Sequence, residues 1–165
     1  MAWNGMQLVV CSALIAASAS AAAATPTVGQ VAPPFSIKLF DGTKTTLADY
    51  RGKVLVINYW ATWCGPCKSE MPMMSAFHRK NHDRGFEIVG VVTEDSVPKS
   101  QLARVVAALS YPLASKLTGK YGTINNSVPT SYVIDRAGRI RYAKAGSFSR
   151  EEFIEVVGPL LDEPG

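Results

Sequence analysis

Two cysteines of this chain, Cys64 and Cys67, stand two residues apart in the stretch Trp-Cys-Gly-Pro-Cys. Cysteines at this spacing can exchange disulfides with other thiols, or can hold a soft metal ion between two thiolates. As a purely structural bridge the pair would contribute little, because a disulfide restricts the unfolded chain less when it closes a shorter loop. The spacing therefore favours reactive cysteines over stabilising ones.

A strand and a helix are expected to position this pair. Residues 54–59 are apolar and rich in β-branched and aromatic side chains, which predicts a buried strand. A helix is predicted from Cys64 to about Arg84, where Gly85 ends it. Cys64 then lies in the first helical turn, where free backbone N–H groups and the helix dipole favour a thiolate. We expect Cys64 to attack a disulfide and Cys67 to resolve the mixed disulfide that results.

The N-terminal segment, residues 1–24, has the character of a targeting signal. No Lys, Arg, Asp or Glu precedes Lys38, residues 6–24 are almost wholly apolar or small, and the segment ends in an Ala-x-Ala pattern. We predict a secretory signal peptide that is cleaved after Ala24, which would also remove Cys11. Retention as a membrane anchor is the alternative, and the usual basic residue near the start is missing.

The rest of the chain is expected to form one domain. Residues 25–34 are predicted to be an extended leader and residues 35–165 a single globular domain, because a chain of 165 residues that is 47% hydrophobic suits one core. The further elements that we expect are a hairpin over 35–46, a buried strand at 87–93, helices at 97–110 and 117–121, a hairpin over 130–145, and a last helix that begins at Ser149.

Taken together, these features resemble the thioredoxin fold, and in particular the extracytoplasmic thiol-disulfide oxidoreductases of the TlpA/ResA type in the redoxin (AhpC/TSA) family. The resemblance covers residues 29–161. It rests on the sequence Trp-Ala-Thr-Trp-Cys-Gly-Pro-Cys at 60–67, on Pro72 five residues after the second cysteine, and on Ser-Val-Pro-Thr-Ser-Tyr-Val-Ile-Asp at 127–135. It implies an α/β protein with a thioredoxin-like three-layer fold, in which helices flank a central mixed β-sheet, with an added N-terminal β-hairpin.

The resemblance also implies roles for single residues. Cys64 matches the nucleophile and Cys67 the resolving thiol of a redox-active disulfide. Pro129 matches a cis-proline beside the dithiol, and the backbone of Val128 would pair with a bound substrate chain. The remaining residues that we expect to contact substrate flank the cysteines and are Trp63, Gly65 and Pro66.

Proton transfer is expected from a residue on another element. Asn58 stands where thioredoxins have a buried Asp that helps to move the proton of the resolving cysteine, and Asn cannot titrate. The resemblance places a Glu at the end of the second central strand, which Glu94 matches, and a partly buried carboxylate there could accept the Cys67 proton. The alternative is a solvated loop acid beside Asp95. The loop over 121–129 is longer than is usual in the family, which leaves substrate preference open.

The same residue types also occur in proteins with other chemistries. A Cu(I)-binding metallochaperone is the main alternative, because two thiolates suit Cu(I), although metal carriers of redoxin fold typically space their cysteines by three residues and add a distal His. His78 and His82 approach a zinc-finger spacing with the cysteines, but all four would lie on one helix, so we interpret both histidines as surface residues and predict no metal site. A peroxidase is disfavoured because Ala61 stands where peroxiredoxins have Thr.

We therefore predict a periplasmic or otherwise extracytoplasmic thiol-disulfide oxidoreductase that works without a cofactor. The Gly-Pro dipeptide between the cysteines matches that of reducing thioredoxins, which favours a disulfide reductase over an oxidase. The resemblance implies as partners protein disulfides, for example in apocytochrome c or a copper-site protein during cytochrome c maturation, and a membrane thiol-disulfide electron donor. The net charge of +4 is spread without an aromatic-interleaved basic patch, which argues against nucleic acid. We expect a monomer, while substrate and redox potential stay open.

Overall fold

The computed structural model describes Met1, residues 25–94 and residues 99–165. The predicted signal peptide, apart from Met1, and Asp95 lie outside the described residues. Within the described ranges, no helix is both long enough and apolar enough to cross a membrane.

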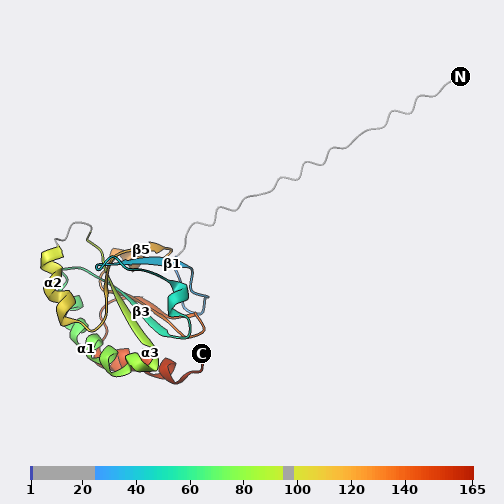
Figure 1. Ribbon diagram of the computed structural model, residues 1–165. Helices are drawn as coiled ribbons and strands as arrows, with labels where there is room; N and C mark the ends of the chain where they lie inside the picture. The colour runs from blue at the N-terminus through green and yellow to red at the C-terminus, as the bar shows by residue number, and fades with distance from the viewer. Residues whose placement is uncertain (2–24, 95–98) are drawn as a thin grey trace.

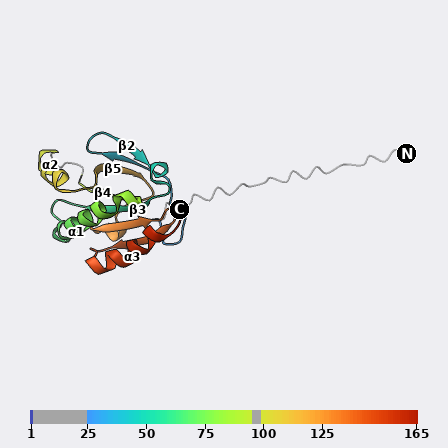
Figure 2. The same cartoon turned by 60° about the horizontal axis from the view of Figure 1, so that its bottom comes forward.

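The described residues form one mixed sheet of seven strands in the order β2-β1-β5-β4-β3-β6-β7 (Figures 1 and 2). The strands are β1 Phe35–Leu39, β2 Lys44–Thr46, β3 Val54–Trp60, β4 Phe86–Val92, β5 Leu113–Gly119, β6 Thr130–Ile134 and β7 Ile140–Ala145. β3 pairs in parallel with β4 and antiparallel with β6. Every residue of β3 is buried, which agrees with the apolar run that predicted this strand.

Three α-helices lie in the described part of the chain, and short 3-10 turns accompany them. Their bounds are α1 Gly65–Asn81, α2 Lys99–Ala108 and α3 Arg150–Asp162, with η1 Leu47–Tyr50, η2 His82–Arg84 and η3 Ile124–Asn126. α1 and α3 lie side by side on one face of the sheet (Figure 2). Side chains of all three helices, among them Met74, Leu102 and Phe153, join one buried cluster with β3 and β4.

The opposite face of the sheet is covered by shorter segments. Its buried cluster consists of strand side chains such as Ile57 and Tyr132, with Leu47 and Tyr50 of η1 and Ile124 of η3 packed against it. The α/β class, the mixed sheet and the N-terminal hairpin of β1 and β2 agree with the sequence analysis. In the chain as described, however, the layer on this second face is built from 3-10 turns and loops, while the α-helices gather on the first.

The predicted helix at 117–121 is wrong, because this stretch belongs mainly to a strand. Leu113–Gly119 form β5, which pairs in parallel with β4 and antiparallel with β1. The register places Leu117 opposite Ile37 of β1, so β5 connects the N-terminal hairpin to the main sheet. Strand formation here depends on pairing with two partners that are distant in sequence, and such pairing overrides a weak local preference for helix.

The strand-turn-helix arrangement predicted around the cysteines is confirmed. Cys64 is the N-cap of α1, and Pro66 lies in its first turn. α1 continues through Pro72 to Asn81, after which Gly85 adopts a φ of 76° in the left-handed region and ends the helical segment. The helix therefore presents its N-terminus at the carboxyl end of β3.

A pair of neighbouring substitutions on α3 tests this packing. Phe153→Ala should lower the free energy of unfolding by about 3–5 kcal/mol, because the Phe153 side chain is fully buried against α1 and the sheet. Ile154→Ala should change it by no more than about 0.5 kcal/mol, because Ile154 is 44% exposed. Urea unfolding of both variants measures the difference, and equal losses would contradict this orientation of α3.

Candidate active site

The two cysteines of the motif are joined by a disulfide at the N-terminus of α1. Both are buried, with 3% of Cys64 and none of Cys67 exposed. The backbone N–H of Cys67 donates to Sγ of Cys64 at 3.2 Å. Because this N–H points at Sγ and the helix dipole has its positive end here, negative charge on Cys64 is stabilised once the disulfide opens.

A second segment of the chain faces Cys64 from the loop before β6. The Val128–Pro129 peptide bond is cis, as the resemblance implied. The carbonyl oxygen of Val128 lies 3.7 Å from Sγ of Cys64. Cys64, Val128 and Pro129, which are far apart in sequence, are therefore brought together at one point.

Internal hydrogen bonds order the long loop that carries Val128. The hydroxyl of Thr130 donates to the carbonyl of Ser127 at 2.7 Å and accepts from the backbone N–H of Ile124 at 3.1 Å. Asn125 and Asn126 adopt φ values of 54° and 53°, a left-handed conformation that Asn tolerates better than most residues. The loop is thus a compact turn that ends at the dithiol.

The two tryptophans near the cysteines lie in different environments. Trp60 is 1% exposed and belongs to the same buried cluster as both cysteines, whereas Trp63 is 70% exposed. Gly65 and Pro66 are also exposed. The disulfide therefore belongs to the same buried cluster as Trp60, while the neighbouring residues Trp63, Gly65 and Pro66 are exposed.

A buried acid that the sequence analysis missed, Glu70, lies one turn of α1 beyond Cys67 and is 3% exposed. Its Oε1 accepts from Nδ2 of Asn58 at 2.8 Å, and its Oε2 accepts from the backbone N–H of Phe148 at 2.8 Å. Asn58 also donates to the hydroxyl of Ser131 at 3.0 Å. The sequence did hold two signals for this cluster: a polar Asn within a buried strand, and an acid three residues after Cys67 on a helix.

The environment of Glu70 changes its acidity. Burial raises the pKa of Glu70 to about 7, and the hydrogen bonds from Phe148 and Asn58 oppose this only in part. A carboxyl group with a pKa near neutral can both accept and release a proton under physiological conditions. Strongly shifted groups of this kind are typical of functional sites.

Glu94, the predicted proton acceptor, binds the turn that precedes Cys64. Its Oε2 accepts from the backbone N–H of Thr62 at 2.5 Å, and its Oε1 accepts from the Thr62 hydroxyl at 2.9 Å. Glu94 is partly buried rather than fully solvated. Its carboxylate therefore holds the connection between β3 and α1 in place.

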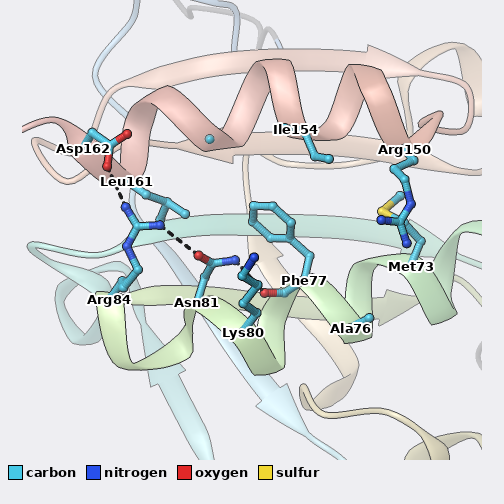
Figure 3. Close-up of a pocket in the computed structure, with 11 residues that line it drawn as sticks. Met73, Ala76, Phe77, Lys80, Asn81, Arg84, Arg150, Ile154, Leu161 and Asp162 are labelled. Carbon is cyan, nitrogen blue, oxygen red and sulfur yellow. Dashed lines mark hydrogen bonds and ion pairs between the residues drawn. The ribbon is translucent and has the colours of Figure 1, made fainter.

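Surface hollows border α1 on more than one side. A groove of about 450 Å³ between α1 and α3 is lined by Phe77 and carries the ion pair of Arg84 with Asp162 at one end (Figure 3). Neither cysteine lines this groove. A hollow of about 290 Å³ includes both Pro66 and Glu70 in its lining. Glu70 therefore borders a hollow that also adjoins the dithiol motif.

Comparisons with known proteins agree with this geometry. The model of the AhpC/TSA family matches residues 28–143. The chain is 34% identical over 128 residues to the thioredoxin-like protein YneN of Bacillus subtilis, and the match covers 75% of each chain. It is 31% identical over 129 residues to the thiol-disulfide oxidoreductase ResA of Bacillus thuringiensis, and the match covers 76% of this chain and 73% of the ResA chain.

A solved structure is similar over nearly its whole length. It is a thiol:disulfide interchange protein of the thioredoxin family from Chlorobium tepidum, with a TM-score of 0.65 and 29% identity. The match covers 84% of this chain and 98% of that chain. The sheet and helices described above therefore form a thioredoxin-like fold.

The raised pKa of Glu70 predicts a pH dependence of stability. Between its ordinary pKa of 4.5 and about 7, the folded protein holds a proton on Glu70 that the unfolded chain has released. The stabilisation is complete below pH 4.5 and is lost as the pH rises through 7, by about 3 kcal/mol for a shift of this size.

Urea unfolding of the oxidised protein between pH 4.5 and 8 measures this effect. Relative to Glu70→Gln, the wild type should lose stability across that range. Glu155→Gln, an exposed position on α3, serves as the matched control and should follow the wild-type curve. Parallel curves for wild type and Glu70→Gln would contradict the expected titration.

Proposed function

The chain belongs to the AhpC/TSA family, in its thiol-disulfide oxidoreductase branch, and on that premise we propose that it reduces disulfides of other proteins outside the cytoplasm. The observation that carries the proposal is the disulfide at the N-terminus of α1, with Sγ of Cys64 facing the Val128 carbonyl at 3.7 Å. A cysteine in this position is suited to become a thiolate and to attack.

The reaction begins with the reduced protein. The Cys64 thiolate attacks one sulfur of a substrate disulfide, so a bond forms between Cys64 and that sulfur while the other sulfur leaves as a thiolate. Cys67 then loses its proton and attacks Sγ of Cys64, which releases the second substrate thiolate and forms the Cys64–Cys67 disulfide. Two electrons pass to the substrate, and an external dithiol must return two electrons to the protein.

We propose that Glu70 accepts the proton of Cys67 in the second step. Support comes from its position one turn after Cys67, its burial and its pKa of about 7. Glu94, the candidate from the sequence, already accepts two hydrogen bonds from Thr62. Its proposed role is to hold the turn that carries Cys64 rather than to move a proton.

Substrate proteins are proposed to dock on the exposed residues around the disulfide. Trp63 supplies a large apolar surface that is 70% exposed, and Gly65 and Pro66 are exposed next to it. The backbone of Val128 would pair with an extended substrate chain beside Cys64, as strand addition does in other peptide complexes. A flat rim of this kind suits a protein substrate better than a small molecule, which needs a concave pocket.

The proposed location is supported by the N-terminal segment, and the proposed partners by the family resemblance. The apolar residues 1–24 support export as a signal peptide, or retention as an anchor, and a site of action in the periplasm. The proposed substrates are disulfides in apocytochrome c or a copper-site protein during cytochrome c maturation. A membrane thiol-disulfide protein is the proposed electron donor, and the protein is proposed to act as a monomer.

The redox potential tests the direction of the reaction. The protein is equilibrated against glutathione and dithiothreitol, and its free thiols are then labelled. We expect a redox potential of about −250 mV or lower, as in reducing thioredoxins. A value of about −130 mV would instead make the protein an oxidant.

Cys64→Ser should abolish exchange, whereas Cys67→Ser should accumulate the mixed disulfide with substrate. If the reduced protein retained Cu(I) against a chelator but failed to exchange disulfides, the metallochaperone alternative would replace this proposal.

The identity of the proton acceptor is tested by two matched acid-to-amide variants. Glu70→Gln should slow release of the second substrate thiol by about a hundredfold at neutral pH, because general-base catalysis contributes an effect of this order. It should also remove the inflection near pH 7 from the rate profile. Glu94→Gln should keep that inflection even if the rate falls. Loss of the inflection in Glu94→Gln and its retention in Glu70→Gln would return the role to Glu94.

A further inference from the structure

A second group of reactive side chains lies at the other end of α1 from the cysteines. It contains both histidines of the chain, His78 and His82, together with Glu87 of β4. The interpretation of both histidines as surface residues is wrong for His78, which is 4% exposed, whereas His82 is exposed. The two are four residues apart on one helical turn, because the backbone N–H of His82 donates to the carbonyl of His78.

The hydrogen bonds of Ser110 are compatible with a neutral His78 that carries its proton on Nδ1. The Ser110 hydroxyl donates its only proton to the carbonyl of Ser75 at 2.8 Å. This hydroxyl lies 3.0 Å from Nδ1 of His78 and can accept from the tautomer that carries its proton on Nδ1. In that tautomer Nε2 has a free lone pair, and it is buried without a hydrogen-bond partner among the residues that the structure describes.

The lone pair of His78 faces a carboxylate. Nε2 of His78 lies 3.7 Å from Oε2 of Glu87, and Nδ1 of His82 lies 3.7 Å from Oε1 of the same residue. These distances exceed those of hydrogen bonds. In that tautomer a metal ion between the two residues would bind the Nε2 lone pair of His78 and an oxygen of the Glu87 carboxylate.

The spacing suits a transition-metal ion. One ligand atom from each of the three side chains lies within 4.8 Å of the other two. Ligand atoms about 2.0–2.1 Å from a tetrahedral Zn²⁺ stand roughly 3.3 Å apart, which is a few tenths of an ångström less than the two 3.7 Å separations. Movement of the His82 side chain, which is 53% exposed, can shorten the separations between the ligand atoms to those of a zinc site.

We propose that His78, His82 and Glu87 form a Zn²⁺ site with two imidazole ligands, one carboxylate ligand and a fourth position open to water. Two imidazoles and a carboxylate are a donor set that zinc accepts readily. Ser110 would hold the His78 ring, as outer hydrogen-bond partners of ligating histidines commonly do. The site lies at the C-terminal end of α1, where the helix dipole favours a cation.

Lys53 competes with the ion for the same carboxylate. Its Nζ lies 2.9 Å from Oε1 of Glu87, and 41% of its side chain is exposed. Zinc would displace this ammonium group into solvent, so the present ion pair lowers the affinity for zinc without blocking the site. His78 follows Cys67 by eleven residues, or roughly 16 Å of helix, so zinc binding does not depend on the disulfide chemistry.

Calorimetric titration of the full-length protein with zinc chloride tests the proposal. The protein is first oxidised, so that the Cys64–Cys67 disulfide is closed, and Cys11 is then alkylated, so that no thiol can bind the metal. One zinc ion should bind per chain. His82→Ala is the principal variant, because an exposed histidine can be removed without loss of the fold, and Asp83→Asn, at the exposed neighbouring position, is its matched control.

The expected pattern separates a built site from adventitious binding. His82→Ala and Glu87→Gln should each weaken zinc binding about tenfold or more, Asp83→Asn should leave it unchanged, and Lys53→Met should strengthen it about threefold. Zinc should also raise the melting temperature of wild type but not of His82→Ala. Equal affinity in His82→Ala and Asp83→Asn, or the absence of any zinc-dependent heat in the wild type, would overturn the proposal. None of these outcomes bears on disulfide exchange.

Discussion

The buried carboxyl group of Glu70 is the interaction on which the architecture around the dithiol depends. A carboxylate removed from water is destabilised by several kcal/mol unless hydrogen-bond donors replace the water. The fold brings donors to Glu70 from Asn58 on β3 and from the Phe148 backbone between β7 and α3. Asn58 in turn donates to Ser131 of β6. One acid on α1 thereby links the helix that carries the cysteines to two strands and to the start of α3.

The hydrogen bonds to Glu70 offset the cost of its burial only in part, and this balance sets its pKa. Two hydrogen bonds keep Glu70 in place, yet burial still raises its pKa to about 7. Full solvation would leave it permanently ionised, and full isolation would leave it permanently protonated. The same balance acts on Cys64, which is buried but receives the backbone N–H of Cys67 and the positive end of the α1 dipole. The acidity of the Cys64 thiol and that of the Glu70 carboxyl group are thus both set within the first two turns of α1.

α1 has different chemistry at its two ends, and the helix dipole contributes to both. Its N-terminus favours the negative charge of a thiolate at Cys64, while its C-terminus favours a positive charge near His78 and His82. The sheet supplies the opposing groups, because Asn58 lies beneath the N-terminal part and Glu87 beside the C-terminal part. Both sites rely on the packing of one amphipathic helix against β3 and β4, so disruption of that packing would affect both.

Local patterns in the sequence determined the secondary structure around the two cysteines. An apolar run, two cysteines at a helix start and a closing Gly85 predicted the strand, the turn and the helix, because backbone propensity and helix capping act over a few residues. Only the tertiary structure decided the environment of Glu70, the burial of His78 and the strand Leu113–Gly119. Each of these depends on partners dozens of residues away. Burial, pKa and strand pairing are properties of such contacts, and local signals such as the polar Asn58 within a buried strand point to them without fixing them.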